Sequence, residues 1–249
     1  MVEKIKVSAV SYVNSYPFIY GLQHHPVSSQ IELELDTPAA CGHKLLSGQV
    51  DIGLVPVALI SELKNPIILG DKCIGSEGPV ETVCLFSDVP LNEIEEVLLD
   101  NESKTSVQLV QVLAEKHWKI SPKWIAAKSG FINRINGKTA GVVIGDRAFA
   151  LRDKHPFVYD LSEAWKSLTG LPFVFACWVS NKELPEDFLA AFNESLQFGL
   201  DERETAIELM AEKNTKEMKR YVTDVISYEL DPKKHEAMKL FARWLCKAV

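Results

Sequence analysis

The chain has 249 residues and a mass of 27.8 kDa, enough for one large domain or two smaller ones with substantial hydrophobic cores. Its 27 lysine and arginine residues against 34 aspartate and glutamate residues give a net charge of −7, and no long basic block occurs, so no nucleic-acid partner is expected. Neither a run of about 18 apolar residues nor a signal-peptide core is found, so we expect a cytoplasmic protein without a membrane span.

The first part of the chain alternates between strand and helix patterns. Residues 5–10 alternate apolar and polar side chains, as a half-buried strand does, and residues 31–35 repeat that pattern. A helix from Pro38 to Gly48 separates the second strand from a third at 50–56. The order β-α-β-α-β-α predicts a parallel sheet covered by helices.

The segment 11–17, Ser-Tyr-Val-Asn-Ser-Tyr-Pro, joins the end of the first strand to the start of a helix. Such a junction presents hydroxyls, an amide and unpaired backbone N–H groups beyond the carboxyl end of a sheet, where α/β proteins bind anions. An ordinary helix start, with Asn14 or Ser15 as the N-cap and Pro17 in the first turn, explains the same residues.

A second α/β unit begins near residue 88. Residues 66–70 and 82–86 are strand candidates, and the glycines and proline of 71–80 predict a loop between them. After a strand at 97–99, residues 103–106 begin an amphipathic helix, and their hydroxyls and N–H groups are able to hold a carboxylate. Ser103 as a simple N-cap is the alternative.

The remaining strand patterns lie at 124–127, 140–146, 157–161 and 173–179, and the rest of the chain reads as helices. Because a tail without strands cannot form a third sheet domain, we expect it to pack on the first. This predicts a first lobe of residues 1–87 and 175–249, with residues 88–174 inserted as a second lobe. The crossings are expected near 82–88 and 173–179. Clefts between such lobes are preferred sites for small ligands.

Several segments, in this order and at compatible separations, strongly resemble the chorismate dehydratase family of the futalosine route to menaquinone. They are residues 11–14, 48–57, 75–80, 103–106, 144–146 and 160–176. The resemblance implies a two-lobed α/β fold of the type II periplasmic-binding-protein kind, with mixed or parallel sheets and a ligand cleft between the lobes. It also implies conversion of chorismate, a small dicarboxylate, to 3-[(1-carboxyvinyl)oxy]benzoate and water. No metal or organic cofactor is implied, and the sequence has no metal, P-loop or dinucleotide motif.

The resemblance implies two catalytic residues, Asn14 and Thr82, where Thr82 stands in the place of the family's usual serine. The residues expected to bind substrate carry hydroxyls or lie at the ends of strands and helices: Ser11, Ser103, Thr105, Ser106, Gly145, Asp146, Thr169 and Gly170. Neutral donors and helix N-termini of this kind compensate the two carboxylates of the substrate. Lys104 stands where arginine is commoner, and lysine does not make the bidentate contact of arginine.

No general base stands out in these motifs, since every histidine lies outside them. One hypothesis is that the enolpyruvyl carboxylate of the substrate removes the proton while Asn14 and Thr82 hold it in place. Asp146 and Asp71 are rival bases, with simpler interpretations as a cap after a buried strand and as a turn residue.

Two other functions compete with a chorismate dehydratase. A solute-binding protein shares the fold, but it requires export or a lipid-anchoring cysteine, and the first cysteine is Cys41 with no signal before it. The sister enzyme that makes 1,4-dihydroxy-6-naphthoate also shares the fold, but it differs in the segment that corresponds to 11–14. The cysteines are odd in number and far apart, which predicts reduced thiols, mostly in cores: Cys41, Cys73, Cys84, Cys177 and Cys246.

Overall fold

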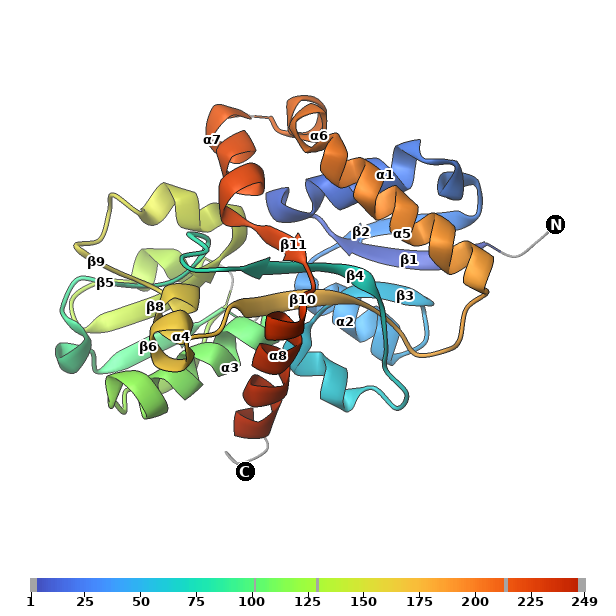
Figure 1. Cartoon of the computed structure of the whole chain (residues 1–249). Coiled ribbons are helices and arrows are strands. Elements are labelled where there is room, and N and C mark those ends of the chain that lie inside the picture. Colours follow the sequence, from blue (N-terminus) through green and yellow to red (C-terminus); the bar gives the residue numbers. More distant parts are fainter. Residues whose placement is uncertain (1–3, 101, 129, 213–214, 246–249) are drawn as a thin grey trace. The chain divides into compact units, whose positions relative to one another are not determined.

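The computed structural model describes residues 4–100, 102–128, 130–212 and 215–245 (Figure 1). The chain forms two compact units. Unit 1 comprises Met1–Gly75 and Val174–Asp231, and unit 2 comprises Ser76–Phe173 and Pro232–Val249. The chain therefore passes from one unit to the other at 75–76, at 173–174 and again at 231–232.

The sheet of unit 1 has the order β11-β4-β10-β3-β1-β2. Its strands are β1 Ile5–Val10, β2 Ile31–Asp36, β3 Ile52–Pro56, β4 Ile67–Ser76, β10 Phe173–Ser180 and β11 Ser227–Glu229. Strand β1 is parallel to β2 and β3, as the β-α-β-α-β-α pattern predicts, whereas β10 is antiparallel to β3 and β11 to β4. The sheet is therefore mixed, and β1, β2 and β3 end at the same edge.

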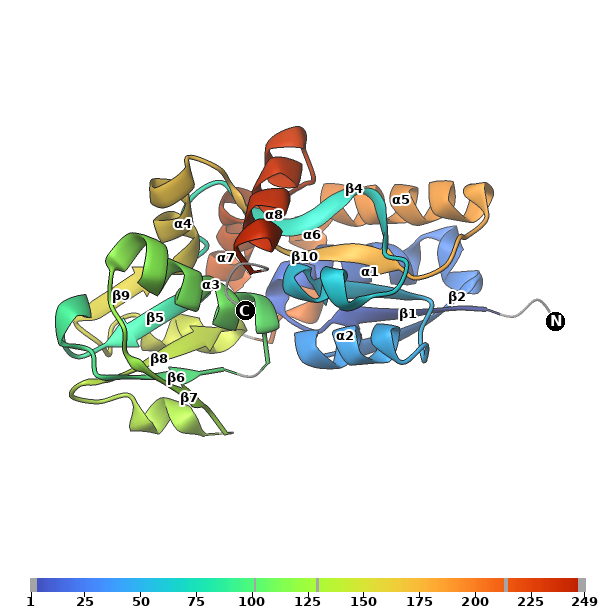
Figure 2. The same ribbon diagram turned by 90° about the horizontal axis from the view of Figure 1, so that it is seen from below.

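The helical segments of unit 1 are η1 Val13–Ser15, α1 Tyr16–His24, η2 Pro26–Ser29, α2 Pro38–Leu46, η3 Val57–Glu62, α5 Glu186–Asp201, α6 Arg203–Met210, α7 Thr215–Arg220 and η8 Tyr221–Val225. Figure 2 shows α2 on the opposite face of the sheet from α5. Helices α1 and α5 touch through glycine: a Cβ added to Gly21 would lie 2.0 Å from the carbonyl oxygen of Ser195, and one added to Gly199 would lie 1.9 Å from that of Pro17. Only glycine permits this contact.

The sheet of unit 2 has the order β7-β6-β8-β5-β9. Its strands are β5 Val83–Ser87, β6 Glu96–Leu99, β7 Lys123–Ala126, β8 Thr139–Ile144 and β9 Phe157–Asp160. Strands β6, β7 and β8 are parallel and end at one edge. Strand β5 runs antiparallel to β8 and to β9, with Val83 opposite Ile144 and Cys84 opposite Asp160. The start of β5 and the end of β9 consequently lie at that same edge.

The helical segments of unit 2 are η4 Leu91–Glu93, α3 Lys104–Leu113, η5 Ala114–Trp118, η6 Phe131–Arg134, η7 Gly145–Leu151, α4 Leu161–Thr169 and α8 Pro232–Leu245. Helix α8 belongs here because its aromatic side chains meet Trp165 of α4: the ring centroids of Phe241 and Trp244 lie 5.8 and 5.2 Å from that of Trp165. The terminal helix is thus a member of unit 2, unlike the rest of the helical tail.

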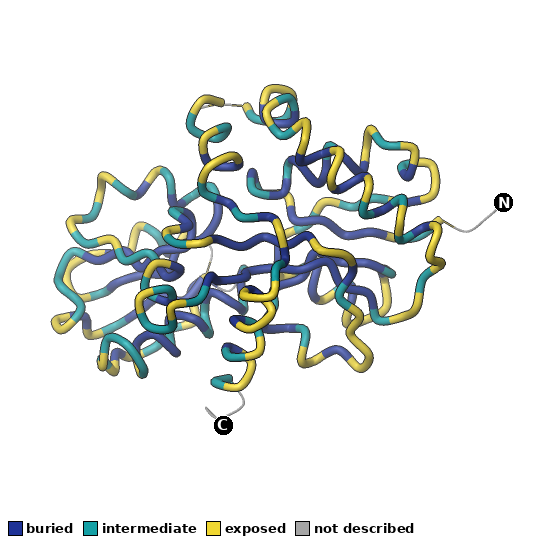
Figure 3. The backbone as a smooth tube through the Cα atoms, in the orientation of Figure 1, coloured by how far each residue is buried: buried dark blue, intermediate teal, exposed yellow. Residues whose placement is uncertain are grey.

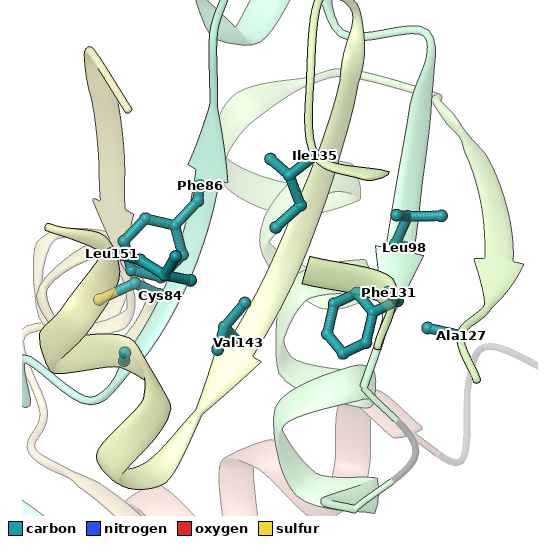
Figure 4. Packing of buried hydrophobic residues seen from close by; sticks show 9 residues of the cluster. Cys84, Phe86, Leu98, Ala127, Phe131, Ile135, Val143 and Leu151 are labelled. Atoms are coloured by element: carbon teal, nitrogen blue, oxygen red, sulfur yellow. The ribbon is translucent and has the colours of Figure 1, made fainter. Parts of the chain in front are cut away.

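The cores are built from the central strands, which are the darkest parts of the tube in Figure 3. One cluster of unit 2 packs η6 and η7 against β5, β6 and β8 (Figure 4). Its fully or nearly buried members are Cys84, Phe86, Leu98, Ala127, Phe131, Ile135, Val143, Ala148 and Leu151. This cluster fixes the sheet whose edge carries most of the predicted site residues.

The observed units differ from the division expected from the sequence in two places. Strand β5 was expected in the first lobe but pairs on both sides within the sheet of unit 2. The segment 232–249 was also expected in the first lobe, whereas the aromatic side chains of α8 pack on Trp165 of unit 2. In addition, residues 71–76 of the expected loop extend β4, because Gly75 pairs with Ser227 of β11.

The described cysteines Cys41, Cys73, Cys84 and Cys177 are buried thiols, as the sequence predicts, and Cys246 lies outside the described residues. Burial raises the pKa of the Cys41 thiol to about 12 and that of Cys177 well above its usual value. Within the described ranges, no helix is long and apolar enough to span a membrane. In the same ranges, no group of three or more His, Cys, Asp or Glu side chains could hold a metal ion.

Candidate functional site

Unit 2 gathers most of the predicted site residues at one edge of its sheet. Thr82 precedes β5, residues 103–106 follow β6 and begin α3, and Gly145 and Asp146 follow β8. Because β6 and β8 end where β5 begins, these three segments are neighbours. A fourth segment joins them, since β9 ends at this edge with Asp160.

Thr82 is tied to the end of β8 through the backbone. Its carbonyl oxygen accepts a hydrogen bond of 2.9 Å from the N–H of Gly145, and its hydroxyl makes a long contact of 3.5 Å with the carbonyl of Val80. The Thr82 side chain is buried. Gly145 has a φ of +65°, a backbone conformation that suits glycine.

The first turn of α3 carries the other predicted hydroxyls. Ser103 is the N-cap: its Oγ accepts a hydrogen bond from the Ser106 N–H at 3.3 Å and lies 3.0 Å from the Ser106 hydroxyl. Ser103, Thr105 and Ser106 are all buried, and Lys104 between them is partly exposed. The capping interpretation of Ser103 is therefore confirmed, and the positive end of the α3 dipole lies at this edge.

Arg147 brings charge to the same edge. Its Nη2 lies 2.7 Å from a carboxylate oxygen of Asp100 and 2.9 Å from one of Glu102. Asp100 is 3% exposed, and burial raises the pKa of its carboxyl group, while the Arg147 charge opposes that rise. The sequence analysis did not single out Arg147 or Asp100, because an isolated aspartate and an isolated arginine form no motif.

Asp160 accepts four backbone hydrogen bonds through its carboxylate. Oδ2 accepts from the N–H groups of Val80 at 2.9 Å and Glu81 at 2.6 Å, and Oδ1 accepts from those of Ser162 at 2.9 Å and Glu163 at 3.1 Å. Burial raises the pKa of this carboxyl group, and the four donors oppose the rise. Asp160 thus joins the turn before Thr82 to the start of α4.

A hydrogen bond between two serine hydroxyls also joins the segment before Thr82 to the start of α4. Ser76 and Ser162 lie with their Oγ atoms 2.6 Å apart, and both are buried. The glycine- and proline-containing stretch 75–80 is therefore fastened to the N-terminus of α4. The sequence offered one signal for this, since Asp160 followed by Glu163 has the spacing of a helix N-cap pattern.

Glu81 has a left-handed backbone, with φ of +67°. For a residue with a Cβ, this conformation costs about 1–2 kcal/mol. Its carboxylate accepts a hydrogen bond from Arg152 Nη2 at 2.7 Å, and its carbonyl oxygen accepts one from the same nitrogen at 3.1 Å. No sequence signal marks Glu81, because positive φ usually occurs at glycine or asparagine.

Thr169 and Gly170 lie at the far end of α4, about 13 Å along the helix axis from its start. The Thr169 hydroxyl donates to the carbonyl of Trp165 at 2.8 Å and accepts from the N–H of Leu171 at 3.1 Å. Gly170 ends the helix with φ of +75°. The structure therefore does not bring these two residues to the edge that carries Thr82.

In unit 1, Ser11 and Asn14 follow β1. The exposed Ser11 donates its hydroxyl to the carbonyl of Asp36 at 3.2 Å. Asn14 lies in η1 and is partly exposed; its Oδ1 accepts from the Ser15 hydroxyl at 3.1 Å, and its carbonyl accepts from the buried Tyr228 hydroxyl at 2.9 Å. Ser15 is the N-cap residue of α1 and Pro17 lies in its first turn, as the alternative interpretation states, although the Ser15 side chain makes no capping hydrogen bond.

The rival base Asp71 lies in β4 rather than in a turn. Its carboxylate is 3.1 Å from the Lys72 ammonium, and its carbonyl accepts from the Leu230 N–H at 2.7 Å. Asp146, the other rival, is partly buried in the first turn of η7. A surface groove of about 620 Å³ in unit 1 adjoins Lys4, Gln30 and Lys182, at the end of β1 opposite to Ser11.

Comparison with known proteins identifies the family. A family model described as menaquinone biosynthesis matches residues 5–247. A chorismate dehydratase from Thermus thermophilus is 29% identical over 213 residues, which are 74% of this chain and 78% of that protein. A chorismate dehydratase from Campylobacter jejuni is 30% identical over 153 residues, 57% of this chain and 65% of that protein.

Solved structures agree on the fold. A protein from Archaeoglobus fulgidus aligns with a TM-score of 0.78 at 15% identity, over 98% of this chain and 97% of that one. The periplasmic aliphatic sulphonate binding protein SsuA from Escherichia coli aligns with a TM-score of 0.63 at 13% identity, over 100% and 93% of the two chains. The fold is thus a two-lobed α/β fold of the periplasmic-binding-protein kind, which confirms the fold class expected from the sequence.

Proposed function

The chain belongs to the menaquinone biosynthesis family, and we propose that it is an enzyme that removes water from chorismate to give 3-[(1-carboxyvinyl)oxy]benzoate. The observation that carries this proposal is the similarity to a relative named chorismate dehydratase, which spans 213 residues at 29% identity. The polar edge of unit 2 supports it, because it offers neutral donors of the kind that a dicarboxylate needs.

The proposed reaction is an elimination. The C–H bond at the ether-bearing ring carbon and the C–O bond of the neighbouring hydroxyl break, and the released electron pair completes the aromatic ring. The proton and the hydroxide leave together as water, so no oxidant or reductant is consumed. Aromatisation supplies the driving force, and the protein has to orient the substrate and stabilise the departing hydroxide.

In this proposal, Asn14 of unit 1 and Thr82 of unit 2 are the catalytic residues. The start of α3 supports anion binding in unit 2, since it combines three hydroxyls with the positive end of a helix dipole. Arg147 adds a cation, which Asp100 and Glu102 already neutralise. We therefore assign charge compensation mainly to neutral donors, as in an oxyanion hole.

We propose that the enolpyruvyl carboxylate of the substrate acts as the base. The ion pair of Asp71 with Lys72 speaks against Asp71, because a base has to be available to the substrate. Asp146 remains the protein carboxylate to test. If Asp146→Asn abolishes turnover while substrate binding persists, Asp146 is the base and the proposal of a substrate base fails.

The test of function is incubation of the purified protein with chorismate, followed by chromatography and ultraviolet absorption. Stoichiometric loss of chorismate with gain of an aromatic 3-substituted benzoate supports the proposal. Tight binding of chorismate without turnover would instead indicate a solute-binding protein. If the protein neither binds nor converts chorismate, the proposal fails. The sister naphthoate-forming activity is then the alternative to examine.

A further inference from the structure

Asp160 makes more hydrogen bonds than a helix cap requires. Capping of α4 is complete with Oδ1, which accepts from the N–H groups of Ser162 and Glu163. Oδ2 points to a different segment and accepts from Val80 and Glu81, at 2.9 and 2.6 Å. Helix capping therefore does not explain the two hydrogen bonds of Oδ2.

One of the two N–H groups that Oδ2 binds belongs to Glu81, a residue with a strained backbone. Glu81 holds its left-handed φ of +67° without the freedom of glycine. Three hydrogen bonds keep it there: one from its N–H to Asp160, one to its carbonyl from Arg152, and one to its carboxylate from Arg152. The Arg152 guanidinium in turn lies 4.9 Å from the centre of the Phe149 ring.

The conformation of Glu81 sets the place of Thr82, the next residue. If φ of Glu81 returned to the negative range that suits its side chain, the chain after it would turn away from the end of β8. With Glu81 left-handed, the Thr82 carbonyl accepts its 2.9 Å hydrogen bond from the Gly145 N–H.

We propose that Asp160 and the Glu81–Arg152 pair form a clamp that holds Glu81 left-handed and thereby positions Thr82. The catalytic consequence rests on the proposed function, whereas the clamp itself is a property of unit 2. Asp160 is in this account a positioning residue that acts through the backbone of residues 80–82 and need not touch the substrate.

The variant Asp160→Asn separates clamping from capping. An asparagine keeps one oxygen, which is able to cap Ser162 and Glu163, but it places an NH₂ group against the N–H groups of Val80 and Glu81. We expect helix α4 to remain folded, with unchanged far-ultraviolet circular dichroism. The amides of Val80 and Glu81 should exchange with solvent at least about 10-fold faster, because they lose their acceptor. Asp160→Ala loses both functions and serves as the comparison.

A second pair of variants tests the strain. Glu81→Ala and Glu81→Gly both remove the carboxylate that pairs with Arg152, but only glycine adopts positive φ without strain. We expect the glycine variant to keep more activity than the alanine variant, by about 5-fold or more in kcat, with KM changing less than kcat. A purely structural salt bridge would make the two variants equal.

The outcomes distinguish the clamp from the proposed function. Unchanged exchange of the Val80 and Glu81 amides in Asp160→Asn, or equal kcat for the two Glu81 variants, overturns the clamp. If wild-type protein does not convert chorismate, the proposed function fails, and amide exchange in Asp160→Asn together with the stability of the two Glu81 variants still decides whether the clamp exists.

Discussion

The two units hold their proposed catalytic residues by different means. In unit 1, Asn14 receives one neutral hydrogen bond on its carbonyl from Tyr228, and the helix that follows it is fixed by glycine contacts with α5. In unit 2, Thr82 follows a strained turn held by charged groups, the Asp160 carboxylate and the Arg152 guanidinium. Helix packing and neutral hydrogen bonds hold the first residue, whereas hydrogen bonds to charged groups hold the turn before the second.

This difference predicts different weaknesses. A site held by packing tolerates a change of charge nearby but not a change of volume. A site held by charge-assisted hydrogen bonds tolerates small changes of volume but not the loss of one charge, because the partner is then left buried and unpaired. Four sets of variants test this contrast.

Replacement of the proposed catalytic residue in unit 1 should have the largest effect. Asn14→Ala removes the amide that we propose to orient the substrate carboxylate, and we expect kcat/KM to fall about 10²–10³-fold, as for loss of one oxyanion donor. Steady-state kinetics with chorismate measures it. Gln23→Ala, an exposed polar position on α1, is the matched control and should retain wild-type kinetics. Equal activity of the two variants would remove Asn14 from the mechanism.

In unit 2, Thr82→Val keeps the shape of the side chain and removes only its hydroxyl. We expect kcat to fall about 10²-fold, while Thr82→Ser, which keeps the hydroxyl, should stay within about 3-fold of wild type. Single-turnover kinetics separates this loss from any change in binding. Wild-type kcat in the valine variant would show that the Thr82 hydroxyl has no catalytic part.

The packing in unit 1 is tested by Gly199→Ala, whose new methyl group would lie 1.9 Å from the Pro17 carbonyl oxygen. Separation of α1 from α5 should lower the free energy of unfolding of unit 1 by about 1–3 kcal/mol. Urea denaturation and amide exchange in α1 measure it. Gly78→Ala, where nothing lies within 4 Å of the added Cβ, should shift stability by less than about 0.5 kcal/mol. Similar shifts for both would contradict the tight helix contact.

The smallest expected effect is the pH dependence of the free energy of unfolding that arises from Asp100 in unit 2. Because burial raises the pKa of Asp100 above its usual 3.8, the folded chain holds a proton at pH values where the unfolded chain has released it. The contribution of Asp100 to stability is therefore complete below that usual value and decreases as pH rises through the folded-state pKa. Its slope is at most about 1.4 kcal/mol per pH unit, the limit for one proton.

Comparison of the urea midpoints of wild type and Asp100→Asn between pH about 4 and about 6 measures this contribution. The wild-type midpoint should fall more steeply with rising pH than that of the variant. Asp153→Asn, at an exposed position, is the control and should follow the wild type. Parallel curves for wild type and Asp100→Asn would contradict the raised pKa.

The sequence predicted the elements whose burial is periodic. Residues 5–10 and 31–35 became β1 and β2, and 140–146 overlaps β8, because one face or both faces of these strands are buried. It did not predict the extension of β4 through residues 71–76, since the partner β11 has only three residues and no pattern of its own. The amphipathic pattern of α8 predicted a helix but not its packing against α4 of unit 2.

The site was predictable only in part. Thr82, Ser103 and Gly145 stand next to strand ends, and the order of strands in the sheet makes them neighbours. The left-handed backbone of Glu81 has no sequence signal, and its hydrogen-bond partners Asp160 and Arg152 come from distant parts of the chain. Local patterns report local preferences, and a conformation that tertiary contacts enforce against preference escapes them.

The measurement that tests the central proposal most directly uses chorismate that carries deuterium at the ether-bearing ring carbon. We predict that the purified protein releases this deuterium to solvent and yields an aromatic product without the label, with a slower rate than for unlabelled chorismate if proton removal limits turnover. Recovery of intact labelled chorismate, or a product that retains the deuterium at that carbon, would contradict the proposed elimination.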